Sequence, residues 1–399
     1  MFGASKIVVG LEIGTSKVCV VVAEWDESAP VEIIGLGLAS TSGGVRKGEI
    51  VNSEVVEDAV RLALAEAESQ SDVEIDSVYL GITGSHIRGI NGSGMHLISS
   101  VDREIDREDV CHVITSAQPK ISSDYRVLHT VGQVFRVDGQ GGVKNPLGRM
   151  ASRLEVDVHV VSGHRNRIQN SLRLIDGLGI KVDDFAFNGR VMALPVLTPH
   201  LGEQGVLVID IGAGTSEYAV YLGGSIRHCG ILAVGGEHVT NDLAVGLKLT
   251  RSRAESLKLD HGSAICELSS AHRTVNYSRG IVGVGAKQIL IGDLRRIINV
   301  RLEELFKLVR ADLESKNLMG KINGGILLSG GVSRTPQINE LAHSVFQLNV
   351  LTNSENHADA DGKILRPETL TSIGLAEHAV RQIKAGGRRK KGFFSWLAR

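Results

Sequence analysis

Two short stretches of the chain combine small residues, hydroxyls and an acid in an order that suits the binding of a polyphosphate. The first reads EIGTSK at residues 12–17, and the second reads DIGAGTS at residues 210–216. Glycine leaves backbone N–H groups open to phosphate oxygens, and the hydroxyls of threonine and serine add further donors. The acid at the start of each stretch does not bind phosphate itself, but it can hold the water shell of a Mg²⁺ ion that does. The sequence therefore predicts a phosphate site that is gripped from two sides.

Strand-like runs flank both stretches. Residues 6–24 and 205–224 each read as an apolar run, a tight turn and a second apolar run, which predicts a hairpin with the small residues at its tip. A lone Gly-Thr-Ser is most often a plain turn, but both copies carry an acid at the same place. This recurrence favours a shared function and predicts two related α/β halves that face each other across a cleft.

Other motifs of nucleotide and hydrolase chemistry do not fit. A dinucleotide-binding interpretation of Gly212 and Gly214 lacks the third glycine, and a strand pattern follows where a helix should begin. The chain contains no GxxxxGK[ST] loop and no GxSxG elbow. Its net charge of −1 predicts no generally basic surface, so we expect no nucleic-acid partner.

A third stretch, residues 324–342, runs from an apolar strand into an amphipathic helix that carries Ile338 and Leu341. Gly330 and Gly331 lie between strand and helix, and paired glycines let a flat ring approach the backbone closely. Taken alone this arrangement is common.

The four cysteines, Cys19, Cys111, Cys229 and Cys266, form no CxxC pair, so we expect reduced thiols of a cytosolic protein.

These three stretches, in this order and at this spacing, resemble the actin-like ATPase superfamily. The resemblance implies ATP and Mg²⁺ in the cleft, with hydrolysis slow at most, because Glu12 stands where actin has the shorter aspartate. It places the two connecting helices of the superfamily at residues 183–197 and 371–380, and it implies that Glu12 and Asp210 hold Mg²⁺ through water. The implied nucleotide contacts are Gly14, Thr15, Ser16, Lys17, Gly212, Gly214, Thr215, Ser216, Glu255, Lys258, Gly330 and Gly331.

The segment between the first hairpin and the first connecting helix predicts a small α+β insertion. Residues 102–117 predict a helix capped by Asp106, with Asp109 in a capping-box position. Residues 126–139 predict a strand. Residues 153–163 alternate strictly, with Leu154, Val156, Val158 and Val160 on one face and Glu155, Asp157 and His159 on the other.

This insertion, together with residues 78–87 and 141–161, resembles the FtsA family of bacterial cell-division proteins, and the likeness covers essentially the whole chain. The resemblance implies an ATP-dependent adaptor that self-associates into filaments and binds the C-terminal peptide of FtsZ. It also implies recruitment of later division proteins through the insertion. The long amphipathic helix predicted over 292–314 carries Arg301 and Glu304, which the resemblance implies as FtsZ contacts. A PilM-like pilus-assembly scaffold and a sugar kinase or ATPase of the same superfamily are the alternatives.

The fold class that follows is α/β, an actin-like fold in which a ribonuclease H-like unit is duplicated, with an inserted α+β subdomain and a C-terminal amphipathic helix. The implied subdomains are 1A at 1–83 and 164–200, 1C at 84–163, 2A at 201–235 and 306–370, and 2B at 236–305. A return helix to 1A is expected at 371–385, and a linker with a membrane-targeting helix at 386–399.

The last fourteen residues, GGRRKKGFFSWLAR, differ in composition from the rest of the chain. Aromatic residues make up only 4% of the sequence, yet three of them fall in its last seven positions. On a helix, Phe393, Phe394, Trp396 and Leu397 share one face, which predicts an interfacial amphipathic helix. The residues that precede it suit an anionic membrane surface, namely Arg388, Arg389, Lys390 and Lys391. A frayed end, or a helix docked on the body, is the alternative.

Neither a signal peptide nor an apolar run of membrane-spanning length is apparent in the sequence. We therefore expect a cytosolic protein, or one held at a membrane by something weaker than a span. The resemblance to the FtsA family implies a peripheral protein on the cytoplasmic face of the inner membrane, at the division septum.

Overall fold

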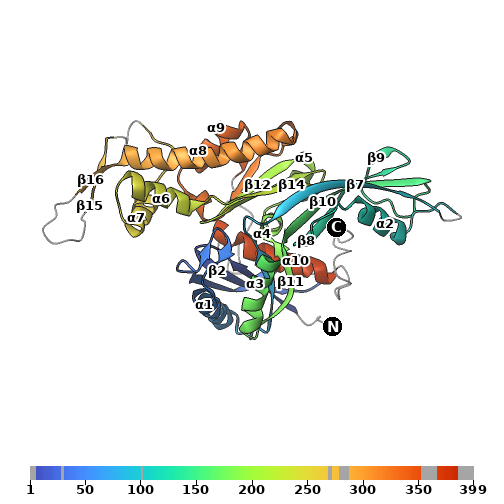
Figure 1. The fold of residues 1–399 in the computed structure, drawn as a ribbon, viewed down its shortest axis with the longest axis horizontal. Coiled ribbons are helices and arrows are strands. Elements are labelled where there is room, and N and C mark those ends of the chain that lie inside the picture. The colour runs from blue at the N-terminus through green and yellow to red at the C-terminus, as the bar shows by residue number, and fades with distance from the viewer. Residues whose placement is uncertain are drawn as a thin grey trace.

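The computed structural model describes residues 6–27, 31–99, 102–267, 272–277, 287–351 and 366–384. The predicted tail helix at 386–399 lies outside the described residues. Three large sheets organise the chain: two of five strands and one of four strands, with helices packed against them (Figure 1). Among the described residues, no helix is both long and apolar enough to cross a bilayer.

The strands and helices have the following bounds. The strands are β1 (Lys6–Ile13), β2 (Lys17–Trp25), β3 (Glu32–Ser40), β4 (Val45–Arg46), β5 (Glu49–Ile50), β6 (Ser77–Ile82), β7 (Arg88–Leu97), β8 (Tyr125–Val137), β9 (Gln140–Val143), β10 (Arg153–His164), β11 (Lys181–Phe187), β12 (Val206–Ile211), β13 (Ser216–Leu222), β14 (Ser225–Leu232), β15 (Thr274–Tyr277), β16 (Lys287–Leu290), β17 (Ile326–Ser329) and β18 (Val350–Leu351). The helices are α1 (Ser53–Ser71), α2 (Arg107–Ala117), α3 (Arg165–Gly177), α4 (Asn188–Val191), α5 (Pro199–Gln204), α6 (Gly236–Gly246), α7 (Arg251–His261), α8 (Ile291–Ser315), α9 (Ile338–Phe346) and α10 (Leu370–Lys384). Three 3₁₀ turns are η2 (Met319–Lys321), η3 (Gly331–Arg334) and η4 (Pro367–Thr369).

The two five-stranded sheets share one topology. The first has the order β3-β2-β1-β6-β11 and the second the order β14-β13-β12-β17-β18. In each, the first three strands form an antiparallel meander, the fourth pairs in parallel with the third, and the fifth pairs in parallel with the fourth. This identity of strand order confirms the predicted pair of related halves.

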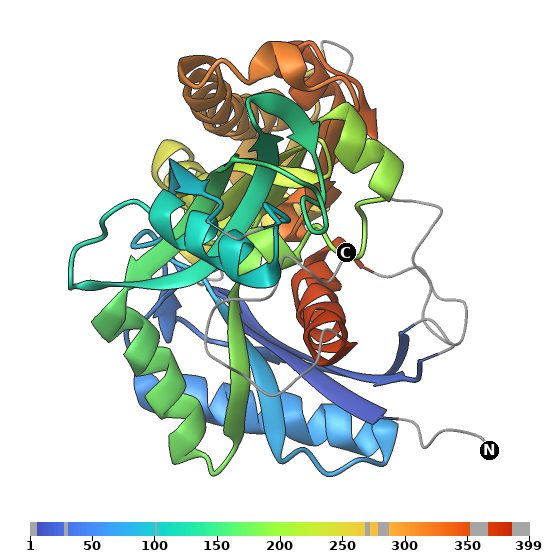
Figure 2. The ribbon, with the colours of Figure 1, turned by 90° about the vertical axis from the view of Figure 1, so that its right-hand side faces the viewer.

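The first sheet is covered by helices on both faces, which is why its strands read as nearly continuous apolar runs. Helix α1 packs on β2 and β3, and α10 packs on β1 and β2; Figure 2 shows these helices on opposite sides of the sheet. Gly10 on β1 permits the contact with α10, because a Cβ there would lie 2.2 Å from the carbonyl oxygen of Ser372. Helix α10 contains residues 371–380, so that predicted connecting helix is confirmed.

The first connecting helix is much shorter than expected. Residues 183–187 continue strand β11, since Phe185, Ala186 and Phe187 pair in parallel with β6 and are buried. Only Asn188–Val191 forms the helix α4. The prediction of a helix across 183–197 is therefore wrong for its first five residues, because sheet pairing decides the conformation of an apolar run that is ambiguous by itself. It is also wrong for residues 192–197, which form a turn and irregular chain.

The insertion folds as a four-stranded sheet, β7-β10-β8-β9, with α2 packed on β7 and β10. The predicted capping box is present: the side chain of Asp106 accepts from the backbone of Asp109, whose carboxylate accepts from the backbone of Asp106. Leu154, Val156 and Val158 face α2 and are fully buried, as is Val160. The strand pattern and the capped helix predicted from the sequence are thus confirmed.

One residue of the insertion does not follow the polar and apolar alternation. His159 faces away from α2 but is completely buried, because this end of β10 lies against β14 of the second sheet. Its ring nitrogens contact Asn91 Oδ1 at 2.6 Å and Cys229 Sγ at 3.1 Å. Cys229 and Cys19 are buried, Cys111 and Cys266 are half-buried, and all four are free thiols.

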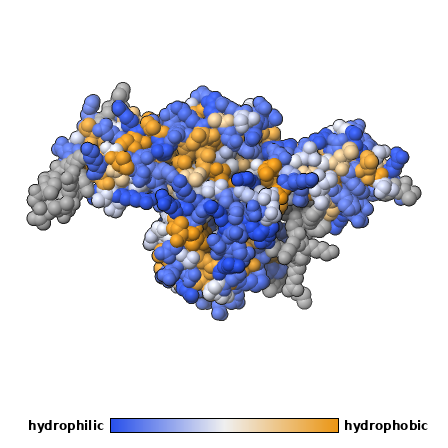
Figure 3. All heavy atoms as spheres, viewed as in Figure 1, coloured by the Kyte–Doolittle hydropathy of each residue, from blue (hydrophilic) through white to orange (hydrophobic). Residues whose placement is uncertain are grey.

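Helix α8 matches its predicted span within one residue at each end. Its apolar stripe, which is at most 1% exposed, contains Leu294, Ile298, Leu302, Leu305, Val309 and Leu313. The stripe packs on α6, α7 and α9, and α8 lies along one edge of the second half (Figure 1). In Figure 3 apolar surface gathers over the second half in the region of α8 and α9.

Candidate nucleotide-binding site

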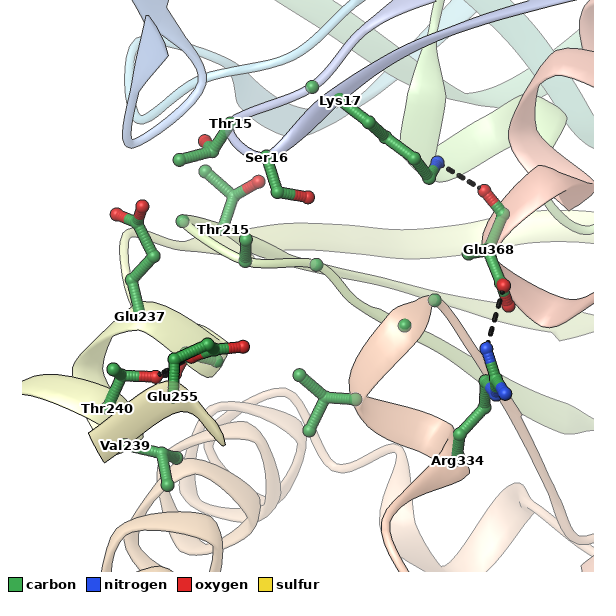
Figure 4. A pocket seen from close by; sticks show the side chains of 18 of the residues that line it. Thr15, Ser16, Lys17, Thr215, Glu237, Val239, Thr240, Glu255, Arg334 and Glu368 are labelled. Carbon is green, nitrogen blue, oxygen red and sulfur yellow. Dashed lines mark hydrogen bonds and ion pairs between the residues drawn. The ribbon is translucent and has the colours of Figure 1, made fainter. Parts of the chain in front are cut away.

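A cavity of about 1180 Å³ lies between the two halves. Both hairpin tips line it, as do η3, α6, α7 and the segment that leads into α10 (Figure 4). Of the residues predicted to contact nucleotide or Mg²⁺, all but one line this cavity: Glu12, Gly14, Thr15, Ser16, Lys17, Asp210, Gly212, Gly214, Thr215, Glu255, Lys258, Gly330 and Gly331. The fold therefore brings together residues that are more than 300 positions apart in sequence.

The two hairpin tips have the same construction. The N–H of Gly14 donates to the carbonyl of Lys17 at 2.8 Å, and the N–H of Gly212 donates to that of Thr215 at 2.9 Å. Between the last paired residues of its two strands, each hairpin thus has a loop of four residues, and the acid of each stretch lies two residues before the first glycine of that loop. The tips also touch: a Cβ at Gly214 would lie 2.3 Å from Thr15 Oγ1.

Ser216 is the exception among the predicted phosphate contacts. It is the first residue of β13 and pairs with Ile211, just as Val18 pairs with Ile13 in the first hairpin. Its hydroxyl donates to the carbonyl of Val234 at 2.8 Å, and the residue is fully buried. The prediction aligned Ser216 with Ser16 because Gly-Thr-Ser recurs in both stretches. The two loops have the same length, however, so Ser216 corresponds to Val18 and lies inside the strand.

Three buried carboxyl groups meet at the base of the cavity. Glu12 comes from the first hairpin, and Asp210 and Glu217 face each other in the β12–β13 pair. Burial raises the pKa of Glu12 to about 7, against the opposing effect of Lys17 and with a further upward contribution from Asp210. Burial also raises the pKa of Asp210, and raises that of Glu217 well above its ordinary value, with Asp210 adding to the effect. The site thus has more acidic than basic groups, and burial disfavours their charged forms.

Lys17 is the basic residue that these acids face. Its ammonium donates to the carbonyl of Glu368 at 2.5 Å and lies 4.0 Å from Glu12 Oε2. Burial lowers the pKa of Lys17, but Glu12 and the other nearby acids outweigh burial and raise it overall. Figure 4 shows Glu368 between Lys17 and Arg334, whose guanidinium donates to Glu368 Oε1 at 3.0 Å. One residue therefore contacts cations from both halves.

The donor set of this acidic centre fits a hydrated Mg²⁺. Two buried oxygens of residues that line the cavity, Glu12 Oε2 and Asn188 Oδ1, have no hydrogen-bond donor. Within the described ranges, no three acids, histidines or cysteines are close enough to bind a metal directly. Mg²⁺ keeps several of its waters in such sites, so it suits oxygens that accept from water better than a closed protein cage.

The remaining wall of the cavity is formed by Gly330 and Gly331 and by α6 and α7. Gly330 has a φ of +81°, and a Cβ there would lie 2.2 Å from Asp210 Oδ1, so only glycine fits. Around Gly331 a Cβ would meet nothing within 4 Å, which leaves open space for a ring. Lys258 donates to Glu255 at 2.7 Å and to Thr240 at 2.9 Å, which holds both charged side chains at the wall. Figure 4 shows Glu255 beside Thr240.

Several lining residues were not found from the sequence. Glu217 had a signal: it is a single acid in the otherwise apolar strand SEYAVYL. Thr83, Asn188, Thr371 and Glu368 had none, because tertiary packing alone brings them to the cavity. Thr371 Oγ1 donates to Asp210 Oδ2 at 2.9 Å, and Asn188 Nδ2 donates to Glu12 Oε1 at 3.4 Å, so each steadies an acid of the centre.

The predicted partner contacts lie outside the cavity, on α8. Arg301 donates to Asp242 of α6 at 2.5 Å and to Glu304 at 2.5 Å. These hydrogen bonds raise the pKa of Arg301, the bond to Asp242 contributing most. The predicted membrane contacts, residues 388–397, lie outside the described residues.

The fold and the cleft define a protein of the actin-like class. The solved structure titled "PilM-PilN type IV pilus biogenesis complex" has a TM-score of 0.66 at 17% identity, covering 94% of this chain and 98% of that one. MreB5 of Spiroplasma citri bound to ADP has a TM-score of 0.57 at 15% identity, covering 96% of this chain and 98% of that one. At these identities the likeness shows the fold.

The sequence comparisons give the family. The sequence profile of "Cell division protein FtsA" matches residues 207–374, and that of "SHS2 domain inserted in FTSA" matches residues 84–162. The cell division protein FtsA of Pseudomonas aeruginosa is 34% identical over 96% of this chain and 91% of its own length. That of Borreliella burgdorferi is 36% identical over 96% and 94%. The chain belongs to the FtsA family of cell-division proteins.

The contact between the two hairpin tips can be tested with Gly214→Ala. The new methyl group would overlap Thr15 Oγ1, so the tips must separate. We expect a loss of stability of about 1–3 kcal/mol, measured by urea unfolding, because strain of this kind has that typical cost. Gly132→Ala is the control, since a Cβ there would meet nothing within 4 Å. Equal stabilities of the two variants would contradict the contact.

The acidic centre predicts a pH dependence of stability. The pKa of Glu12 rises from 4.5 to about 7 on folding, so folded chains keep a proton that unfolded chains lose between these values. Stability should therefore fall as pH rises through this window, by about 3 kcal/mol in total from Glu12. Glu12→Gln removes this loss. Its stability relative to the unmodified chain should increase from pH 4.5 to pH 7 and then level off.

Urea unfolding without ATP or Mg²⁺ measures this difference, and the exposed Glu32→Gln controls for removal of a carboxylate as such. The difference in unfolding free energy between Glu12→Gln and the unmodified chain should change between pH 4.5 and pH 8. If it is the same at both pH values, Glu12 does not keep its proton in the folded state.

Proposed function

We propose that this chain binds ATP with Mg²⁺ in the cleft and acts as an adaptor that links the FtsZ division ring to the cytoplasmic face of the membrane. The observation that carries the proposal is the acidic centre, Glu12, Asp210 and Glu217, directly below two hairpin tips of equal construction. Carboxyl groups alone would repel a polyphosphate, whereas a divalent cation between them would attract both.

Each element of the cleft has a role in this proposal. The N–H groups and hydroxyls of both tips hold phosphate oxygens, as does the ammonium of Lys17. Glu12 and Asp210 accept hydrogen bonds from the water shell of Mg²⁺, whose charge offsets theirs when it is bound. The open space at Gly331 accommodates adenine, and Glu255 and Lys258 face the ribose and the base.

ATP in this cleft would contact both halves at once and so favour their closed arrangement. We propose that the closed chain self-associates and that hydrolysis is slow. Family membership supports a role in cell division, and MreB5 of Spiroplasma citri, solved with ADP and with AMPPNP, shares the fold.

The FtsZ peptide is proposed to dock where α6 and α8 meet. Arg301 and Glu304 lie on the same helical face as the exposed Val300 and Leu308. Val245 of α6 is 72% exposed and follows Asp242, the partner of Arg301, by one helical turn. Charged groups of both signs beside apolar surface suit a short peptide that carries both kinds of side chain.

The docking surface is tested by titrating full-length protein with a fluorescent FtsZ C-terminal peptide. Arg301→Glu should weaken binding at least 10-fold, because it reverses a charge that is already positioned by Asp242. Lys307→Glu is the matched control, a charge reversal at an exposed cation of the same helix. A similar effect of both substitutions, or no binding by the unmodified chain, would count against the surface.

The tail is proposed to anchor the protein reversibly. Four large apolar side chains would each contribute roughly 1.5–3 kcal/mol if fully buried. Ordering the segment costs on the order of 1–2 kcal/mol per residue, so a single tail binds weakly. A filament that presents many tails gains by avidity, roughly 100-fold or more for each linked pair. ATP-dependent self-association would thus control membrane binding.

Co-sedimentation with anionic liposomes tests the whole proposal. Residues 1–399 should sediment with the liposomes, more so with ATP and Mg²⁺, and residues 1–385 should not. A neutral phosphatidylcholine liposome is the control for the basic residues. Equal sedimentation of both chains would contradict the role of the tail as the membrane anchor. Sedimentation of residues 1–399 that is the same with and without ATP would contradict the control of membrane binding by the cleft.

A further inference from the structure

The insertion is joined to the first half by a neck of two chain segments, residues 83–88 and 162–165. The two segments are bound to each other: the N–H of His164 donates to Nδ1 of His86 at 3.2 Å. They also pack closely, since a Cβ at Gly163 would lie 2.8 Å from the side chain of Ile87. The two segments of the neck are therefore in direct contact.

The neck begins inside the nucleotide cleft. Thr83 follows the last residue of β6 and lines the cavity. Its hydroxyl donates to Oε1 of Glu217, which lies on β13 of the other half. Glu217 pairs directly with Asp210, so the contact connects the neck to the acidic centre across the two halves.

A second path connects the neck to the first hairpin tip. Thr15 Oγ1 accepts from the N–H of Gly48 at 3.1 Å. Gly48 in turn lies against the neck, because a Cβ there would be 2.9 Å from Cα of Gly84. The short β4–β5 turn, which contains Gly48, is thus inserted between the phosphate tip and the neck.

The body of the insertion rests on the second half. Asn91 Nδ2 donates to the carbonyl of Arg227 at 3.1 Å, and Gln133 Nε2 donates to that of Ile226 at 3.0 Å. His159 reaches Cys229 of the same strand. These contacts hold the insertion on the edge strand β14, while its neck belongs to the first half. A change in the angle between the halves must therefore be absorbed at the neck or at β14.

We propose that Thr83 is the positioning residue through which the nucleotide in the cleft sets the orientation of the insertion. This inference rests on the proposed nucleotide site. A ligand that binds Thr15 and the acidic centre acts on both connections of the neck at once, one through Gly48 and one through Glu217. The insertion then adopts one orientation on β14 when the cleft is filled and is less constrained when it is empty, which makes its partner-binding surface depend on the ligand.

Hydrogen exchange of the full-length protein tests this inference, with ATP and Mg²⁺ as the ligand. The amides of Ile87, which donates to Gly84, and of His164 report on the neck. In the unmodified chain, saturating ATP should slow their exchange by about 2- to 10-fold, the factor that one net hydrogen bond supplies. Thr83→Val keeps the shape but removes the donor, so this slowing should disappear. Thr83→Ser keeps the hydroxyl and should restore it.

Calorimetric titration with ATP accompanies each exchange measurement, and Thr115→Val on α2 is the control for a threonine-to-valine change within the insertion. Absence of ATP binding by the unmodified chain would refute the nucleotide site itself and this inference with it. If Thr83→Val binds ATP and the exchange of its neck amides slows as much as in the unmodified chain, this inference is overturned but the nucleotide site is not. Loss of ATP binding in Thr83→Val but not in Thr83→Ser would also overturn it, because Thr83 would then be a ligand contact.

Discussion

The structure depends on the burial of three carboxyl groups opposite one lysine at the junction of its two halves. Leaving a buried charge without compensation costs several kcal/mol, and burial raises the pKa values of all three acids. Nearby donors steady them: Asn188 contacts Glu12, Thr371 contacts Asp210, and Thr83 contacts Glu217. The Mg²⁺ proposed above would offset the charge of these acids, and it would account for acids that lie below loops suited to phosphate.

Because the acids come from both hairpins, the same constraint joins the two halves. Lys17 and Arg334, from different halves, meet at Glu368, which directly precedes α10. One small region, around Lys17, Arg334 and Glu368, therefore joins the cavity, both halves and the segment that leads into α10. The nucleotide-dependent self-association proposed above needs this kind of coupling between the two halves.

Local patterns predicted much of the fold. The hairpins, the capping box at Asp106 and the apolar stripe of α8 follow from periodicities that operate within a few residues, and the structure has all of them. Predictions failed where tertiary pairing decides. The run that ends at Phe187 continues a sheet, Ser216 lies within a strand, and His159 is buried by another part of the chain. Thr83 has its role through Glu217, and no spacing in the sequence connects positions 134 residues apart.

The most direct test of this account is the dependence of ATP affinity on Mg²⁺, measured by calorimetry with the full-length chain at pH 7.5. If the acidic centre requires a cation before it accepts a polyphosphate, removing Mg²⁺ with a chelator should weaken ATP binding by on the order of 100-fold, and proton release should accompany binding when Mg²⁺ is present. Equal affinity with and without Mg²⁺, and no proton release, would contradict the central role assigned to Glu12, Asp210 and Glu217.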